Sequence, residues 1–249
     1  MTIALTDLHT HILPALDDGA DSVETALRML RAEKAAGVQR VALTPHFYPM
    51  REELDAFLKK RQQSYAALLA AWDGVVMPSL RLGAEVRYSP ALLELDLRHL
   101  TIGESDYLLL ELPDRSVPTH VEQVLDMMLM QGITPILAHV ERCEYFRRDP
   151  EQLRKLVYMG ALAQISAKAL ADGHDRNFAK ACLKNGVAQI IASDAHDMKR
   201  HKPCLGDVTA KVNNERIAWS EKFAQAVWDN ESPPDFTIAP IKKGLLGYC

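Results

Sequence analysis

The feature that most constrains how this chain can fold is a regular alternation of short apolar segments with longer amphipathic ones. Each apolar segment has the length and composition of a buried strand, and segments with helical signals separate them. The alternation predicts a parallel sheet with helices on its outside. Because one strand occurs per roughly 35 residues, a closed or nearly closed barrel is favoured over an open sheet. The expected strands cover residues 3–11, 38–43, 80–84, 107–110, 135–138, 162–165 and 188–192.

The helices and the end of the chain carry their own signals. Asp21 is expected to be the N-cap of the first helix, with Glu24 as its capping-box partner. A last helical stretch is expected at about 207–229, and the tail from about Ser232 is expected to be irregular because prolines interrupt it. The chain is long enough for one large core, and we expect a single domain over residues 1–249.

The composition argues against several classes of partner. The net charge is −4, so nothing drives the chain electrostatically toward nucleic acid or an anionic membrane surface. The chain does not open with a charged segment followed by an apolar stretch, and no apolar run approaches the roughly 18 residues of a membrane span. We expect a cytoplasmic protein that binds no nucleic acid and is not inserted in a membrane.

The four cysteines are scattered and form no Cys-x-x-Cys pair, which argues against structural zinc and against a disulfide framework. None is followed by arginine at the offset of a cysteine-based phosphatase loop, so hydrolysis by a thiolate is not expected. Neither a Gly-x-x-x-x-Gly-Lys loop nor a dinucleotide fingerprint occurs, so nucleotide cofactors have no support.

Potential metal ligands recur at the ends of the expected strands. In parallel barrels the carboxyl ends of the strands meet at one rim, where the chemistry takes place. A strand through residues 3–11 also places Asp7, His9 and His11 on one face, because side chains alternate along it. The residues at or just past the strand ends are His9, His11, His46, Glu85, Glu111, His139, Asp194 and His196.

Each of these residues has an explanation that needs no metal, because histidines and carboxylates at strand ends also cap helices or face solvent. Eight of them at the same end of six strands are hard to explain as caps. Mixed imidazole and carboxylate groups are ligands for divalent transition metals. The pattern therefore indicates a metal site at this rim. His201 lies away from the strand ends and is expected to have no functional role.

The strand ends also carry particular short sequences. In chain order they are Asp7-Leu8-His9-Thr10-His11-Ile12-Leu13-Pro14, Asp17-Asp18-Gly19, Thr44-Pro45-His46, Gly83-Ala84-Glu85, Ala138-His139-Val140-Glu141-Arg142 and Ala192-Ser193-Asp194-Ala195-His196. Together they resemble the PHP (polymerase and histidinol phosphatase) family, and most closely its bacterial capsule or exopolysaccharide-type protein-tyrosine phosphatases. The likeness runs in order from residue 5 to about residue 200.

The resemblance implies a distorted seven-stranded (β/α)7 barrel, TIM-like and of the PHP type, that holds three divalent metal ions. Manganese is expected first, with iron, zinc or magnesium as alternatives. The implied ligand groups are His9, His11, Glu85 and Asp194 for one metal, a shared bridging Glu85 with Glu111 and His139 for the second, and Asp18, His46 and His196 for the third.

The resemblance also implies an activity. Arg142 and Arg200 match the phosphate-contacting arginines of the family, although a solvated basic face explains Arg200 equally well. The chain would hydrolyse a phosphomonoester, with a hydroxide that bridges the metals as the nucleophile. Arg142 would hold two phosphoryl oxygens with its planar fork. Asp197 is a candidate general acid, with a helix N-cap as its alternative role.

The implied substrate is a phosphotyrosine protein, specifically a bacterial tyrosine kinase that regulates capsule or exopolysaccharide synthesis. A small-molecule phosphatase such as histidinol phosphatase could use the same metals, and a non-catalytic metal-binding PHP module is a further alternative. An amidohydrolase would be expected to bridge its metals with a modified lysine, where this chain has Glu85 and Glu111. The sequence alone does not separate the two phosphatases.

Overall fold

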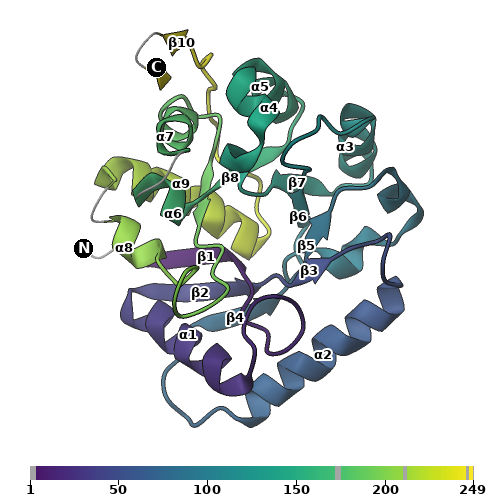
Figure 1. Ribbon diagram of the computed structural model, residues 1–249, viewed down its shortest axis with the longest axis vertical. Helices are drawn as coiled ribbons and strands as arrows, with labels where there is room; N and C mark the ends of the chain where they lie inside the picture. Colours follow the sequence, from purple (N-terminus) through teal and green to yellow (C-terminus); the bar gives the residue numbers. More distant parts are fainter. Residues whose placement is uncertain (1–3, 172–174, 210–211, 245–246, 249) are drawn as a thin grey trace.

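The strands form two parallel sheets in the computed structural model, which describes residues 4–171, 175–209, 212–244 and 247–248 (Figure 1). One sheet has the order β1-β2-β4 and consists of β1 (Leu5–Thr10), β2 (Val38–Leu43) and β4 (Ser79–Leu82). The other has the order β3-β5-β6-β7-β8-β9 and consists of β3 (His46–Phe47), β5 (Glu85–Arg87), β6 (Tyr107–Glu111), β7 (Thr134–Leu137), β8 (Leu162–Ser166) and β9 (Ile190–Ala192).

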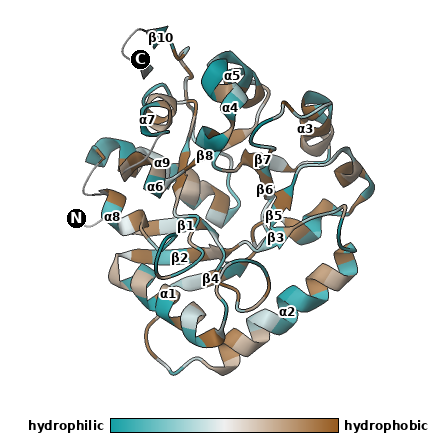
Figure 2. Cartoon of the chain, viewed as in Figure 1, coloured by the Kyte–Doolittle hydropathy of each residue, from teal (hydrophilic) through white to brown (hydrophobic). Residues whose placement is uncertain are grey.

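Helices surround these strands, and hydrophobic residues concentrate along strands such as β7 and β8 (Figures 1 and 2). The α-helices are α1 (Val23–Ala35), α2 (Leu54–Ala70), α3 (Val121–Met130), α4 (Glu144–Arg148), α5 (Pro150–Tyr158), α6 (Ala167–Ala171), α7 (Arg176–Lys184), α8 (Leu205–Thr209) and α9 (Asn214–Asp229). Short 3-10 helices cover Pro90–Glu94, Leu97–Leu100 and Val140–Arg142. In the described part of the chain, no helix is long and apolar enough to cross a membrane.

The expected alternation of strands and helices is confirmed, but the expected strand at 80–84 is divided. β4 ends at Leu82 and β5 begins at Glu85, so Glu85 starts a strand instead of following one. The backbone bonds continue across this break, since the Glu85 N–H donates to the Pro45 carbonyl over 3.0 Å. At the other edge the Asp194 N–H donates to the His9 carbonyl over 2.9 Å. A continuous closed barrel is not seen among the described residues.

Two helix boundaries differ from the sequence prediction. Ser22, and not Asp21, is the N-cap of α1, because its hydroxyl accepts the Thr25 N–H over 3.2 Å. The stretch at 207–229 holds two helices, α8 and α9, with Asn213 as the N-cap of α9. The tail is irregular as expected, except for the short antiparallel pair β10 (Lys243–Gly244) and β11 (Gly247–Tyr248), while residues 245–246 and 249 lie outside the described residues.

One end of the strands is closed by α9. Phe223 and Val227 of this helix are fully buried in a cluster with Tyr107 and Leu162, which begin β6 and β8. The Tyr107 hydroxyl also donates to the Glu231 carbonyl over 2.6 Å, just past the helix. Because α9 covers the amino ends of the strands, the carboxyl ends are left open for a site.

Glu221 ties α9 to β1 and makes the stability of the fold depend on pH. Its carboxylate accepts the N–H of Thr6 over 2.9 Å and the Thr6 hydroxyl over 2.6 Å. Burial raises the pKa of Glu221 from 4.5 to about 7, although these hydrogen bonds oppose the rise. The folded chain therefore binds a proton that the unfolded chain has lost, and its stability falls as the pH rises from about 4.5 to about 7.

We expect Glu221→Gln to flatten this dependence, because the amide cannot ionise. Between pH 5 and pH 8 the free energy of unfolding of wild type should fall by about 1 to 2 kcal/mol more than that of the variant. This figure is reduced from the full effect of the pKa shift because the carboxyl is partly exposed. Urea denaturation at both pH values measures the difference. Glu215→Gln, at an exposed position of the same helix, is the control and should leave the dependence unchanged. If the free energy of unfolding changes with pH in the same way in wild type and Glu221→Gln, the raised pKa of Glu221 is contradicted.

Candidate metal centre

Four buried side chains from three strand ends converge on one point. The Nε2 atoms of His9 and His11 lie 3.1 Å apart, and Glu85 Oε2 lies 3.2 Å from each of them. Asp194 Oδ1 lies 3.3 Å from His9 Nε2 and 3.6 Å from His11 Nε2. All four residues are almost fully buried. Lone pairs that meet at such distances, away from solvent, are the arrangement that a cation would stabilise.

Several buried atoms of these residues and of their neighbours make close contacts but no hydrogen bond of acceptable geometry. They are Glu85 Oε2, Asp194 Oδ1, Glu111 Oε2, His46 Nδ1 and His139 Nδ1. Buried polar atoms without partners are uncommon in native proteins and call for an explanation such as a bound ion. The mixed nitrogen and oxygen donor set fits a divalent transition metal.

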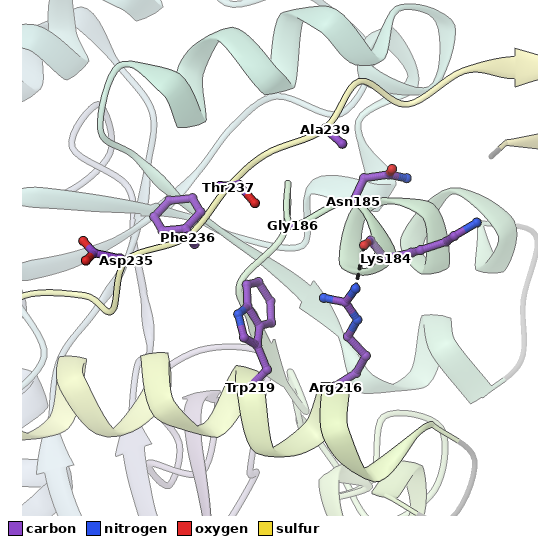
Figure 3. Close-up of a pocket in the computed structure, with 9 residues that line it drawn as sticks. All are labelled: Lys184, Asn185, Gly186, Arg216, Trp219, Asp235, Phe236, Thr237 and Ala239. Carbon is purple, nitrogen blue, oxygen red and sulfur yellow. Dashed lines mark hydrogen bonds between the residues drawn. The ribbon is translucent and has the colours of Figure 1, made fainter.

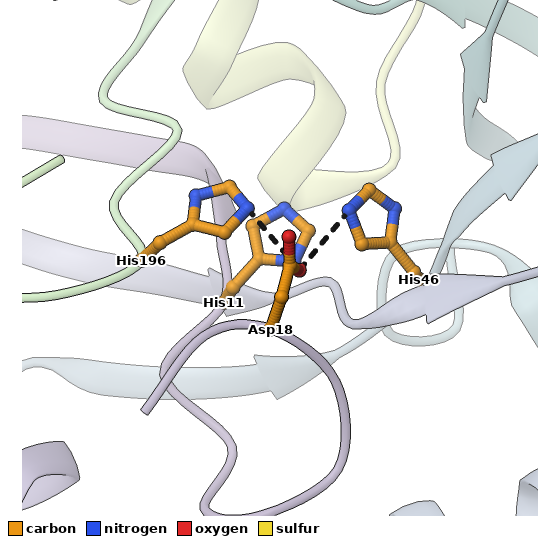
Figure 4. Close-up of side chains that lie close together, drawn as sticks. All are labelled: His11, Asp18, His46 and His196. Carbon is orange, nitrogen blue, oxygen red and sulfur yellow. Dashed lines mark ion pairs between the residues drawn. The ribbon is translucent and has the colours of Figure 1, made fainter. Parts of the chain in front are cut away.

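A second group of donors lies next to the first, toward solvent (Figure 4). His11, Asp18, His46 and His196 each offer an atom within 4.8 Å of the others. Asp18 Oδ1 is 3.4 Å from His46 Nε2 and 3.6 Å from His196 Nε2, while the rings of His11 and His196 stack at 3.9 Å. Asp18 is 71% exposed, so this group forms the open mouth of the site.

Glu85 also lies at the centre of a third group. Its Oε1 is 2.8 Å from His139 Nε2, and its Oε2 is 3.0 Å from His46 Nδ1. Glu111 at the end of β6 offers an oxygen to the same group as His46 and Glu85. Two details differ from the grouping implied by the resemblance. His11 belongs to two groups, and His46 lies closer to Glu85, at 3.0 Å, than to Asp18, at 3.4 Å.

All nine predicted ligands therefore lie together at the carboxyl ends of the strands. Seven of them line a pocket of about 390 Å³, while the fully buried His9 and His11 are not among its lining residues. The residues that line the pocket are Asp18, His46, Tyr48, Glu85, Glu111, His139, Arg142, Asp194, His196, Asp197 and His201. His201, expected to have no role, thus lines this pocket, as does Tyr48, which no sequence pattern singled out.

The loop after β1 folds back over His11 at Gly19. The Ala20 N–H donates to the His11 carbonyl over 2.9 Å, and a Cβ at Gly19 would lie 2.0 Å from that oxygen. Only glycine allows this approach. The Asp17-Asp18-Gly19 sequence thus brings Asp17 against His11 and Asp18 near His46 and His196.

Asp17 and Gln164 hold the rings of candidate ligand histidines. Asp17 Oδ2 lies 2.8 Å from His11 Nδ1 and also accepts the His46 N–H over 2.9 Å. Gln164 Oε1 lies 3.2 Å from His9 Nδ1 and accepts the His139 N–H over 2.7 Å. An acceptor at Nδ1 leaves the Nε2 lone pair of each ring facing the site, which is how partner groups fix the rings of metal-ligating histidines.

Asp7, which lies on the same strand face as His9, does not take this role. Its carboxylate accepts the backbone N–H groups of His9 over 3.3 Å and of Ser193 over 3.0 Å. It therefore joins the end of β1 to the turn that carries Asp194. A carboxylate at this position can accept hydrogen bonds either from backbone N–H groups or from the imidazole of a neighbouring histidine. The sequence does not show which of these two donors it meets.

The ligand carboxylates are held in their charged forms. Burial opposes ionisation of Glu85, but the neighbouring His9 and His11 lower its pKa well below the usual range. Burial likewise opposes ionisation of Asp194, and His9 and Arg142 lower the pKa of that carboxyl. For His11, burial lowers the pKa, yet Asp17 and Glu85 outweigh it and raise that pKa well above normal. The site thus concentrates negative charge around its imidazoles.

Two of the predicted ligands sit on unusual backbone. His139 has φ of 30° and Asp194 has φ of 55°, in the left-handed region that residues other than glycine rarely adopt. Each lies directly after a strand, where the sharp turn aims its side chain at the strand ends. Backbone strain of this kind clusters at functional sites and persists only where the surroundings enforce it.

The two predicted arginines are placed differently. Arg142 follows the end of β7 and forms an ion pair with Asp194 at the pocket wall. Arg200 is exposed and is not among the residues that line the pocket. Asp197 accepts the N–H groups of Lys199, Arg200 and His201, so it caps a turn and not a helix.

A separate pocket of about 410 Å³ lies toward the amino ends of the strands, between α7, α9 and the tail (Figure 3). Arg216 donates to the Lys184 carbonyl over 2.9 Å at one side of it, and Trp219 lies beneath the Arg216 guanidinium. None of the predicted site residues lines this pocket.

The chain is similar to known proteins over most of its length. The family described as "Capsular polysaccharide synthesis, CpsB/CapC" matches residues 5–231. The chain belongs to the CpsB/CapC family. Its relatives are named as tyrosine-protein phosphatases. The tyrosine-protein phosphatase YwqE of Bacillus subtilis (strain 168) is 31% identical over 207 residues, which cover 78% of each chain. The tyrosine-protein phosphatase CpsB of Streptococcus pneumoniae is 28% identical over 226 residues, 83% of this chain and 90% of its own.

Solved structures match the same CpsB/CapC fold. A chain from the crystal structures of YwqE from Bacillus subtilis and CpsB from Streptococcus pneumoniae, described as unique metal-dependent tyrosine phosphatases, superposes with a TM-score of 0.85. It is 24% identical, and the match covers 96% of this chain and 100% of that one. Dihydropyrimidinase from Brevibacillus agri NCHU1002 gives a TM-score of 0.52 at 13% identity, over 95% of this chain and 72% of its own. Both matches show a related mixed α/β fold.

Proposed function

We propose that this chain is a metal-dependent phosphatase that hydrolyses phosphotyrosine in proteins. The observation that carries the proposal is the cluster of overlapping His, Asp and Glu donor groups around Glu85, with Arg142 on the wall of the same pocket. Divalent cations bound there would neutralise phosphoryl oxygens and lower the pKa of water toward 7. The naming of the relatives as tyrosine-protein phosphatases supports the same activity.

The ligand assignment is part of this proposal. We assign His9, His11, Glu85 and Asp194 to one ion, Glu85, Glu111 and His139 to a second, and Asp18, His46 and His196 to a third, as the family resemblance implies. Glu85 lies at 2.8–3.2 Å from nitrogens of four histidines, and a carboxylate with two oxygens can serve more than one cation. We propose three divalent ions, with manganese first. The donor chemistry admits iron, zinc or magnesium as well.

Arg142 is the residue that we propose to hold the phosphoryl group. Its ion pair with Asp194 fixes the guanidinium at the pocket wall, where the side chain is still 35% exposed. A planar fork can donate to two phosphoryl oxygens at once, which orients the group for in-line attack. A contact of Arg200 with phosphate stays a prediction, as does a proton donated by Asp197.

The closed barrel, the kind of substrate, the partner and the cellular location are also proposals. Backbone bonds across the strand breaks and between β1 and the end of β9 support a distorted seven-stranded barrel in a single domain. The open mouth at Asp18 supports a protein substrate over a small one, because histidinol phosphate would need an enclosed pocket. The bacterial tyrosine kinase as partner and the cytoplasmic location stay predictions.

Metal removal tests the activity. We expect p-nitrophenyl phosphate to be hydrolysed with Mn²⁺ present and the rate to fall at least about 100-fold in EDTA, because the ions would supply several kcal/mol of charge stabilisation. Added Mn²⁺ should restore the rate. A phosphotyrosyl peptide should then be a better substrate than histidinol phosphate. If no divalent metal supports hydrolysis, the alternative of a non-catalytic metal-binding module is favoured. If histidinol phosphate is the better substrate, a small-molecule phosphatase is favoured.

A further inference from the structure

A second pocket that shares a wall with the metal centre carries two arginines and no acidic residue. Tyr48 lines both pockets, and the second one has a volume of about 340 Å³. Arg51, Arg87 and Ser89 line it as well, while neither Asp nor Glu is among its lining residues. We call this pocket, defined by Tyr48, Arg51, Arg87 and Ser89, the arginine subsite.

The guanidinium of Arg51 forms no ion pair with a carboxylate of the described residues. Its backbone N–H donates to the Tyr48 carbonyl over 2.9 Å, so the chain turns back on itself here. This turn places the guanidinium over the Tyr48 ring, 5.0 Å from its centre. Within the described residues, no carboxylate lies within ion-pair distance of Arg51, and the neighbouring Glu52 pairs with Lys60. A guanidinium over an aromatic ring can still donate its N–H groups to an anion.

Arg87 links the arginine subsite to the metal centre. Its Nη1 lies 2.7 Å from Glu111 Oε1, and its side chain is 35% exposed. The ring of Tyr48 also lies 5.3 Å from the ring of His46. Arg87 and Tyr48, which line the arginine subsite, therefore each contact one proposed ligand of the metal centre, Glu111 and His46 respectively. A polypeptide that placed a phosphotyrosine on the metals would pass beside the two arginines.

We propose that the arginine subsite binds a second anionic side chain of the substrate, close in sequence to the phosphotyrosine. This inference rests on the proposed phosphatase function and specifies its substrate class as acidic or multiply phosphorylated segments. A carboxylate and a phosphate share the chemistry that a guanidinium recognises, since both accept two parallel N–H bonds. Arg51 would select the substrate without taking part in the reaction.

The test compares three phosphotyrosyl peptides of one sequence, whose flanking position is alanine, glutamate or a second phosphotyrosine. We expect wild-type kcat/KM to be about three- to fivefold higher for an anionic flank, the size of an exposed charge contact. Arg51→Ala should abolish that preference, and Arg51→Glu should reverse it. Added salt should weaken it in the wild type. The larger of the two anionic preferences identifies carboxylate or phosphate as the group bound.

Two controls separate the possible failures. Turnover of p-nitrophenyl phosphate should be unchanged in Arg51→Ala, and Arg28→Ala, at an exposed position on α1, should behave as wild type with every peptide. Equal wild-type rates for all three peptides, or an equal loss for all three in Arg51→Ala, would overturn the subsite while the phosphatase activity stands. A wild type that fails to hydrolyse even p-nitrophenyl phosphate would overturn the proposed function, and the subsite with it.

Discussion

Glu85→Gln is expected to remove nearly all activity together with the bound metal. The Glu85 carboxylate lies within 3.2 Å of nitrogens of His9, His11, His46 and His139, so one negative charge faces four of the histidines in the site. The amide has nearly the same shape but no charge, and its NH₂ group cannot bind a cation. We expect kcat/KM for p-nitrophenyl phosphate to fall at least about 1,000-fold, which corresponds to the several kcal/mol that metal ions contribute.

The metal content of the purified variant distinguishes a ligand from a residue that only shapes the pocket. Elemental analysis of Glu85→Gln should show fewer ions per chain than wild type. Glu104→Gln is the matched control, because Glu104 is an exposed carboxylate outside the pocket. It should keep both metal and activity. A Glu85→Gln protein with full metal content and full activity would remove the central assumption of the proposed function.

The clustering of the candidate ligands could be predicted because they follow a rule of position. Parallel strands meet at one edge with their carboxyl ends, so His9, Glu111 and His139 had to lie near one another once the strands were placed. Glu85 was predicted for the same reason, although it begins a strand of the second sheet instead of ending one. The break at Gly83 and Ala84 is decided by tertiary packing, which strand periodicity does not encode.

The residues that the sequence missed have no such rule. Gln164 is an uncharged residue within β8, and it acts only because its oxygen meets His9 and His139 from other strands. His201 lies in a turn whose path is set by the hydrogen bonds of Asp197. Tyr48 follows a two-residue strand and gave no periodic signal. Contacts between loops depend on the final path of the backbone, and local sequence patterns predict that path poorly.

Arg142→Lys is expected to lower activity strongly while the metal stays bound. Lysine keeps the positive charge beside Asp194, but it loses the planar fork that can hold two phosphoryl oxygens. We expect kcat/KM for p-nitrophenyl phosphate to fall about 100-fold, the usual effect of losing one fixed donor to a developing negative charge. Elemental analysis should show wild-type metal content, since no predicted ligand is changed.

Arg148→Lys provides the control for this substitution. Arg148 lies on α4, just beyond Arg142 in the chain, and its guanidinium pairs with Glu144 over 2.9 Å at a position that is 73% exposed. A lysine there should leave kcat/KM unchanged, because an exposed pair of this kind contributes little. If Arg142→Lys retains wild-type kcat/KM, the guanidinium does not hold the phosphoryl group. If it loses metal in proportion to activity, Arg142 acts by positioning Asp194 instead. Full metal content with a 100-fold loss would place the guanidinium on the substrate.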